Sequence, residues 1–135
     1  MLSGVLVIDK PTGLTSHDVV SRIRTLVGQK RVGHAGTLDP IATGVLPLCL
    51  GAATRIVQLL QQGHKTYRAT LEFGLITDTQ DVTGTVLERR TVPKLAAPEI
   101  EEILSGFRGD IEQVPPLYSA IKRDGTPLYR LARRG

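Results

Sequence analysis

The sequence predicts an α+β fold with a mixed sheet. Short apolar or alternating runs typical of strands are interspersed with segments of helical periodicity, without the strict strand–helix alternation of a parallel α/β protein. Of the 135 residues, 41% are hydrophobic and 22% are charged, the composition of an ordinary globular domain. Aromatic residues make up only 4%, so aliphatic side chains must fill the core. We find no repeat, linker or low-complexity segment, and we expect one modest domain or part of a larger one.

The first predicted elements are a strand and a helix. Residues 5–8 form an apolar, β-branched run that ends at a Lys-Pro-Thr-Gly turn, which predicts a buried strand. Thr15 and Asp18 have the spacing of a capping box, and Gly28 suits a helix end, so a helix is expected between them. Its apolar face would be made by Val19, Val20, Ile23, Leu26 and Val27.

The next segment is rich in glycine and proline, which prevents one long regular element. Its punctuating residues are Gly33, Gly36, Pro40, Gly44 and Pro47. We expect an irregular loop over 33–44, a buried segment over 45–50 and a short helix over 54–61. Cys49, alone in an apolar run, should be a small buried residue.

The second half predicts two strands and a helix. Residues 66–73 alternate between apolar and polar, which indicates a half-buried strand with Tyr67 on its apolar face. A second strand is expected over 85–89, after the polar loop 77–84. Pro98 fits the first turn of a helix. The apolar face of that helix would be made by Ile100, Ile103, Leu104 and Phe107.

The last predicted elements are a strand over 118–122, a turn at Asp124 and Gly125, and a final helix. That helix would present Leu128, Leu131 and Ala132 on one face.

Several classes of protein are disfavoured by the composition. The amino terminus lacks the pattern of a signal peptide, and no apolar run approaches the roughly 20 residues that span a bilayer, so we expect a cytoplasmic protein. His17, His34, His64 and Cys49 lack metal-ligand spacing, so no metal site is expected. The net charge of +4 weakly favours a polyanionic partner.

The candidate functional segment is the loop over 33–44. Its glycines allow unusual backbone conformations and close approach of a ligand. Asp39 precedes Pro40, which favours an extended conformation that could present the carboxylate outward, and His34 lies five residues earlier. An Asp before Pro also commonly makes a simple turn, and a single histidine is often structural. The loop contains neither a P-loop nor a GxSxG motif.

The same loop resembles the signature of the TruB family of pseudouridine synthases, a His-x-Gly-x-Leu-Asp-Pro segment followed by Ala-x-Gly and a hydrophobic run. Other segments resemble further family motifs in the family's order: 4–13, 15–20, 65–68, 74–84, 113–120 and 128–135. The resemblance therefore covers nearly the whole chain. It implies a pseudouridine-synthase-like α+β fold, with a mixed, largely antiparallel sheet flanked by helices.

The resemblance also implies that residues 1–135 are part of a catalytic domain that is incomplete at its carboxyl end. In the family, a later strand supplies an arginine for the catalytic aspartate, and a PUA domain often follows. The implied activity is isomerisation of the T-loop uridine of tRNA to pseudouridine, without cofactor or metal. The expected partner is the T-arm stem-loop of tRNA. The alternatives are a non-catalytic tRNA-binding or tRNA-folding fragment, and a guide-dependent relative that modifies other RNAs.

The resemblance assigns roles to individual residues. Asp39 would be the essential carboxylate, which either attacks the ribose C1′ carbon or assists departure of the base through a glycal-like intermediate. Tyr67 would stack on the flipped uracil and move a proton. His34 would support the distorted T loop, and Lys10 would lie beneath the active site and contact RNA. Gly33, Gly36, Pro40 and Gly44 would shape the loop.

Contacts with phosphate are expected from a group of basic residues along the chain. They are Arg24, Lys30, Arg31, Arg55, Lys65 and Arg68.

Overall fold

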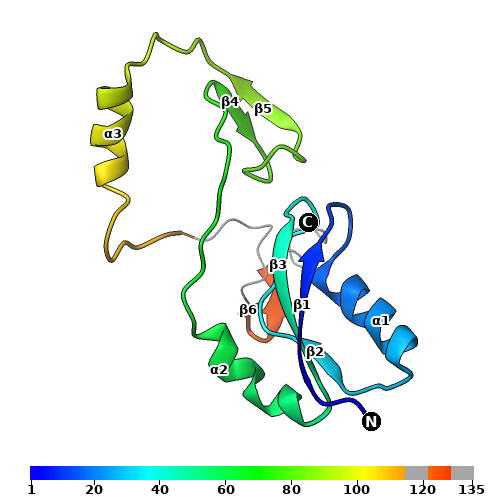
Figure 1. Ribbon diagram of the computed structural model, residues 1–135. Helices are drawn as coiled ribbons and strands as arrows, with labels where there is room; N and C mark the ends of the chain where they lie inside the picture. The colour runs from blue at the N-terminus through cyan, green and yellow to red at the C-terminus, as the bar shows by residue number, and fades with distance from the viewer. Residues whose placement is uncertain (115–121, 129–135) are drawn as a thin grey trace. The chain divides into compact units, whose positions relative to one another are not determined.

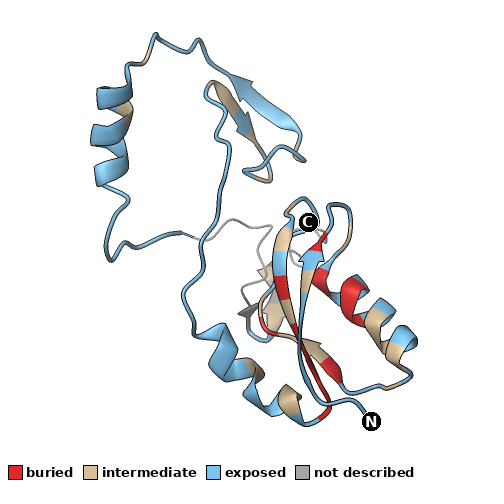
Figure 2. Ribbon diagram, in the orientation of Figure 1, coloured by how far each residue is buried: buried red, intermediate tan, exposed pale blue. Residues whose placement is uncertain are grey.

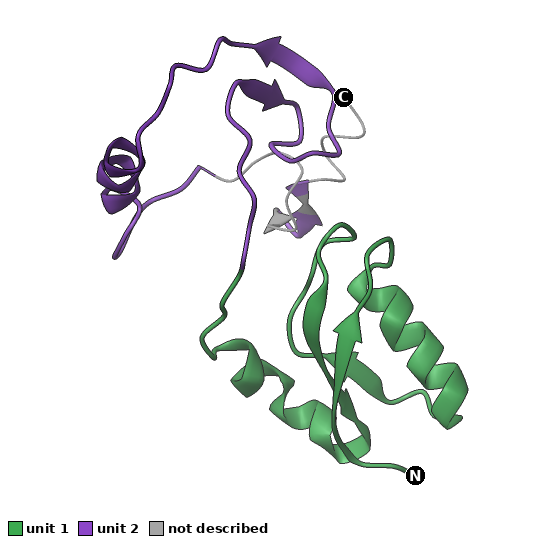
Figure 3. Cartoon of the chain, turned by 45° about the horizontal axis from the view of Figure 1, so that its top comes forward, with its two compact units in different colours: residues 1–67 green, residues 68–135 purple. Residues whose placement is uncertain are grey.

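The computed structural model describes residues 1–114 and 122–128 (Figure 1). The chain divides into two compact units, residues 1–67 and residues 68–135, which are coloured separately in Figure 3. Helices and antiparallel strands occur in both units, which confirms the predicted α+β class. No helix in the described part of the chain is long and apolar enough to cross a membrane.

The first unit is built on a three-stranded sheet of order β1-β3-β2. Strands β1 (Gly4–Lys10) and β2 (Val32–His34) each pair antiparallel with the central strand β3 (Gly44–Leu50). In this register Lys10 lies opposite Gly44, and His34 lies opposite Leu48. The loop that carries Asp39 therefore leaves the sheet beside the end of β1.

Helix α1 (Ser16–Val27) lies against one face of this sheet (Figure 1). The predicted capping box is present: the Thr15 hydroxyl accepts from the Asp18 N–H at 3.1 Å, and the Asp18 carboxylate accepts from the Thr15 N–H at 2.8 Å. Gly28 ends the helix in the left-handed conformation, with φ of 62°, as glycine does at many helix ends. Leu26, predicted on the apolar face, is instead 80% exposed.

The core of the first unit lies between α1 and the sheet, where the buried residues of Figure 2 gather. It consists of Val19, Val20, Val32, Leu46, Leu48 and Leu50. The three leucines alternate along β3, so they share one face of the strand. Fully burying a leucine side chain contributes roughly 1.5–3 kcal/mol, so this cluster accounts for much of the stability of the unit.

The prediction of a buried β1 is only partly correct. Ile8 packs against the core, but Val5 and Val7 are 48% and 62% exposed. β1 is an edge strand, and alternate residues point to the face opposite α1, so these valines lie opposite Cys49 and Pro47 on the face that lacks a covering helix among the described residues. Cys49 is fully buried, as predicted.

The 3₁₀ helix η1 (Gly51–Ile56) and helix α2 (Val57–Gln61) follow β3 directly. They correspond to the short helix predicted over 54–61.

The second unit contains two short antiparallel ladders and a helix. Strands β4 (Leu75–Thr77) and β5 (Val86–Arg89) form a hairpin, and helix α3 (Ala97–Ser105) follows. Strands β6 (Lys122–Arg123) and β7 (Thr126–Pro127) flank the predicted turn, where Asp124 and Gly125 both have positive φ. None of the residues of this unit whose burial is described is buried.

The strand predicted over 66–73 is absent. The segment is exposed and forms no strand pairing with any described residue. Its side chains alternate between apolar and polar, but its backbone makes no ladder of hydrogen bonds with another strand. A strand is stabilised by its partner, and alternation alone does not supply one. Most of the strand predicted over 118–122, and all of the final predicted helix except Leu128, lie outside the described residues.

Candidate active site

The candidate site is the segment 35–43 between β2 and β3, which we call the Asp39 loop. Asp39 is exposed at the surface. Its carboxylate makes no hydrogen bond or ion pair with the described part of the chain, whereas its carbonyl accepts from the Ala42 N–H at 3.0 Å. The backbone is therefore held in a turn and the acidic group is left available.

Lys10 connects the turn after β1 with the Asp39 loop. Its side chain is fully buried, and its ammonium nitrogen lies 2.7 Å from the carbonyl oxygen of Leu14, 3.0 Å from that of Pro11 and 3.5 Å from that of Pro40. A buried ammonium requires such acceptors, because burial of an unpaired charge is costly. The ammonium is directed at three backbone oxygens, and the contact between Lys10 and RNA stays a prediction. The predicted supporting role fits this geometry.

Ser16 holds the residue before Asp39. Its hydroxyl accepts from the Leu38 N–H at 2.9 Å and donates to the Leu38 carbonyl at 3.2 Å. Ser16 was not among the residues predicted for the site. The only sequence signal for Ser16 was its position as a small polar residue directly after the helix cap Thr15. That position does not reveal that its partner is Leu38, which is distant along the chain.

His34 makes a local bond at the start of the loop. Its Nδ1 lies 2.7 Å from the carbonyl oxygen of Gly36. Because a carbonyl only accepts, Nδ1 carries the hydrogen, and Nε2 of the neutral ring is left as an acceptor. The Ala35 N–H donates to the Pro47 carbonyl at 2.9 Å, which ties the loop start to β3.

The loop-shaping glycines differ in their backbone conformations. Gly44 has φ of 112°, which side chains other than glycine rarely adopt. Gly33 and Gly36 lie outside that region, and an added Cβ would meet no atom within 4 Å at either position.

Tyr67 is not joined to the Asp39 loop by any hydrogen bond in the described part of the structure. It lies in the extended segment that follows α2, and its side chain is 66% exposed. Most of the Tyr67 side chain is therefore accessible to a ligand, as far as the described residues go.

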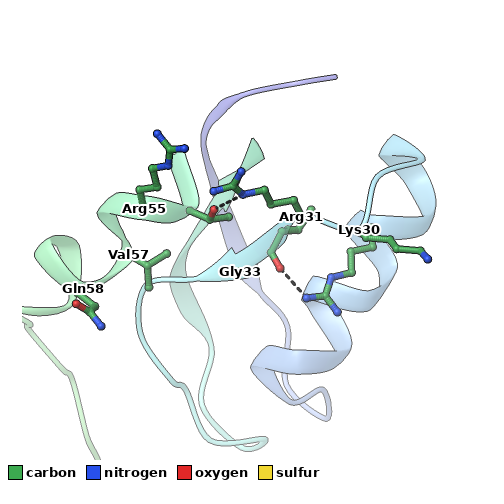
Figure 4. Close-up of a pocket in the computed structure, with 9 residues that line it drawn as sticks. Lys30, Arg31, Gly33, Arg55, Val57 and Gln58 are labelled. Carbon is green, nitrogen blue, oxygen red and sulfur yellow. Dashed lines mark hydrogen bonds between the residues drawn. The ribbon is translucent and has the colours of Figure 1, made fainter. Parts of the chain in front are cut away.

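A basic concavity of about 650 Å³ lies at the beginning of β2 (Figure 4). Four of its lining residues are basic: Arg24, Lys30, Arg31 and Arg55. Among the described residues, no acidic side chain lines it. β2 is only three residues long, so the concavity and the Asp39 loop lie at opposite ends of one short strand.

Two of these arginines are positioned by the fold. A terminal nitrogen of Arg24 donates to the Val32 carbonyl at 2.8 Å, and Nε of Arg31 donates to the Thr54 hydroxyl at 2.9 Å (Figure 4). Nε of Arg24 is buried without a hydrogen-bond partner among the described residues. These contacts orient the side chains but do not neutralise their charge.

The remaining predicted phosphate ligands lie elsewhere. Lys65 donates to the carbonyls of Gln61 and Gly63, and Arg68 is exposed in the second unit.

Burial raises the pKa of the Cys49 thiol, which therefore stays protonated. Within the described residues, no three His, Cys, Asp or Glu side chains are grouped as metal ligands would be.

Comparison with known proteins identifies the family. Residues 24–135 match the family described as "TruB family pseudouridylate synthase (N terminal domain)". The chain belongs to the TruB family. It is 54% identical over 134 residues to a tRNA pseudouridine synthase B of Opitutus terrae, and 52% identical to that of Syntrophotalea carbinolica. These matches cover 99% of this chain but 56% and 44% of the relatives, so the TruB chain described here spans about half of their length.

A solved structure supports the fold. The chain matches a protein in the "Crystal Structure of a Cbf5-Nop10-Gar1 Complex" with a TM-score of 0.56 and 34% identity, over 89% of this chain and 31% of the other. The predicted family and the predicted pseudouridine-synthase-like fold are therefore confirmed.

Proposed function

We propose that this chain is the amino-terminal part of the catalytic domain of a cytoplasmic tRNA pseudouridine synthase that isomerises the T-loop uridine. The observation that carries the proposal is Asp39, an exposed carboxylate without a partner among the described residues, on a loop whose backbone is bound on both sides. The names of the relatives, each a tRNA pseudouridine synthase B, support the same activity.

The reaction requires no net oxidation or reduction. The bond between uracil N1 and ribose C1′ breaks, the base rotates, and a new bond forms between C5 and C1′. C5 then loses its hydrogen as a proton, and N1 gains one. Asp39 acts at the ribose, either by attack on C1′ or by assisting departure of the base. Both roles need an ionised carboxylate, and in the free protein Asp39 is exposed to water.

Bound RNA would cover Asp39 and remove this solvation. Desolvation raises the pKa of a carboxylate unless a cation lies close by. No basic side chain within the described residues forms an ion pair with Asp39. We propose that the arginine implied by the family resemblance, on a later strand outside these residues, supplies that cation.

Tyr67 and His34 act on the flipped nucleotide. The exposed ring of Tyr67 offers a flat face for stacking on uracil, with a polar end for proton transfer. Extruding a base costs a few kcal/mol, which such stacking must offset. Nε2 of His34 remains available as an acceptor for the T loop, because Nδ1 is bound to the Gly36 carbonyl.

The basic concavity binds the phosphates of the T-arm. Its four basic residues, without acidic neighbours in its lining, favour the polyanionic backbone over a neutral ligand. The same feature favours the second candidate function, a fragment that binds tRNA without catalysis, because the concavity does not depend on Asp39.

The deciding experiment is tritium release from a T-arm stem-loop RNA labelled at uridine C5, with RNA binding measured in parallel. The experiment is run on this chain and on the longest translation product of its gene. In each, the parent protein is compared with its Asp39→Asn variant. Asp9→Asn is the matched control, since Asp9 is also exposed and without a hydrogen-bond partner among the described residues. We expect release from the parent and from the control, and none from Asp39→Asn, with binding retained in all three.

Two outcomes would count against the synthase proposal. Binding without release, from both the chain and the longest product, would favour the non-catalytic function. Equal release by Asp39→Asn and its parent would remove Asp39 from the mechanism.

A further inference from the structure

Ser16 binds both polar groups of one backbone residue. Its hydroxyl accepts from the Leu38 N–H at 2.9 Å and donates to the Leu38 carbonyl at 3.2 Å. Ser16 is only 2% exposed, so water cannot readily replace the hydroxyl in either bond. A buried N–H that loses its acceptor is unfavourable, and the backbone of Leu38 is therefore tied to the first residue of α1.

The neighbours of Asp39 are fixed on both sides. The Leu38 side chain packs against the core, and the Pro40 carbonyl accepts from the Gly13 N–H at 2.7 Å. The proline ring after Asp39 also restricts the backbone of Asp39. With these constraints in place, the carboxylate can move mainly by rotation of its own side chain.

The hydroxyl of Ser16 is not needed to cap the helix. Thr15 and Asp18 supply both bonds of the capping box, whereas the Ser16 hydroxyl is directed to the loop. A substitution at Ser16 can thus remove the contact with Leu38 while the helix start keeps its cap.

We infer that Ser16 is a positioning residue for Asp39, which it aligns through the backbone of Leu38. The inference rests on the proposed synthase activity. Misplacement of a reacting group by about 1 Å can cost on the order of 100-fold in rate. Ser16 would therefore act on the chemical step, and RNA binding would depend on other residues.

The test compares Ser16→Ala with Ser21→Ala, an exposed serine of the same helix, in the longest product of the gene. The measurements are C5 tritium release, as kcat and KM per folded molecule, and hydrogen exchange of the Leu38 amide by NMR. For Ser16→Ala we expect kcat to fall about 10- to 100-fold with KM within about twofold, and faster exchange at Leu38. Ser21→Ala should match the parent in kcat, in KM and in the exchange rate of the Leu38 amide.

A kcat for Ser16→Ala within about twofold of the parent, or a loss confined to KM, would overturn the inference. Unchanged exchange at Leu38 would also overturn it, whether or not the protein is active. An inactive parent with faster Leu38 exchange in Ser16→Ala would instead contradict the proposed activity, and the positioning role with it, while leaving the hydrogen bonds in place.

Discussion

The backbone N–H of Gly13 donates to the carbonyl oxygen of Pro40, with 2.7 Å between the two atoms. This bond joins the turn after β1 to the residue after Asp39. The buried Lys10 ammonium reaches the same oxygen at 3.5 Å. The candidate catalytic loop is therefore attached to the first turn of the chain, in addition to the two strands that flank it.

Replacing Lys10 by Met should destabilise the first unit by about 1–3 kcal/mol, because three carbonyl oxygens lose a charged donor. Urea unfolding followed by circular dichroism measures the effect. Lys94→Met is the control, since Lys94 is exposed, and it should change stability by less than about 0.5 kcal/mol. Equal stability of the two variants would contradict a supporting role for Lys10.

The glycines within and directly after the Asp39 loop should respond differently to alanine. Gly44→Ala should cost about 1–3 kcal/mol, because its φ of 112° is strained for any residue with a Cβ. Gly36→Ala should be close to neutral, since an added Cβ there meets open space. Thermal unfolding of the two variants tests the difference. A larger loss for Gly36→Ala would show that the loop backbone differs from the one described.

Removing a basic residue from the concavity should weaken RNA binding in a salt-dependent way. For Arg55→Ala, the slope of log K against log salt concentration should fall in magnitude by about 0.7–0.9, the value for one lost phosphate contact. Binding of a T-arm stem-loop at several KCl concentrations gives the slope. Arg22→Ala, on α1 outside the lining of the concavity, is the comparison and should keep the parent slope.

The loop between β4 and β5 should lose stability in acid. The Thr83 hydroxyl, with help from Thr79, lowers the pKa of Asp81 below its ordinary value of 3.8. A carboxyl whose pKa is lower in the folded state stabilises that state above the unfolded pKa. The contribution is therefore present above about pH 4 and is lost as pH falls through the folded pKa.

An NMR titration of the Asp81 carboxyl measures this shift directly. Thr83→Val, which removes the main donor, should return the pKa of Asp81 towards 3.8. A titration curve that is identical in the parent and in Thr83→Val would rule out the hydroxyl as the cause.

Much of the fold could be predicted because its signals are local. The capping box of α1, the glycine at its end and the turn at Asp124 and Gly125 each use residues a few positions apart. The strand expected over 66–73 failed because alternation describes side chains, while a ladder needs a partner that the described residues do not supply.

The site could be predicted only in part. The loop and Asp39 were predicted through motif resemblance; Asp39 is exposed, and its catalytic role stays a prediction. The contacts made by Lys10 and Ser16 were not predictable, because a buried ammonium or hydroxyl can bind any backbone group that the fold brings near. Neither the distance along the chain nor the type of the acceptor residue identifies such a partner.

The direction of these bonds has a consequence for how the sequence can vary. The side chains of Lys10 and Ser16 are the donors, and their acceptors at Pro11, Leu14, Leu38 and Pro40 are main-chain oxygens that every amino acid carries. A substitution at an acceptor residue can leave the hydrogen bond intact, because the main-chain oxygen remains. A substitution that removes the side-chain donor at Lys10 or Ser16 is not restored by a change at the acceptor residue. Natural selection on the loop should therefore fall on Lys10 and Ser16 without correlated substitutions at the positions they bind.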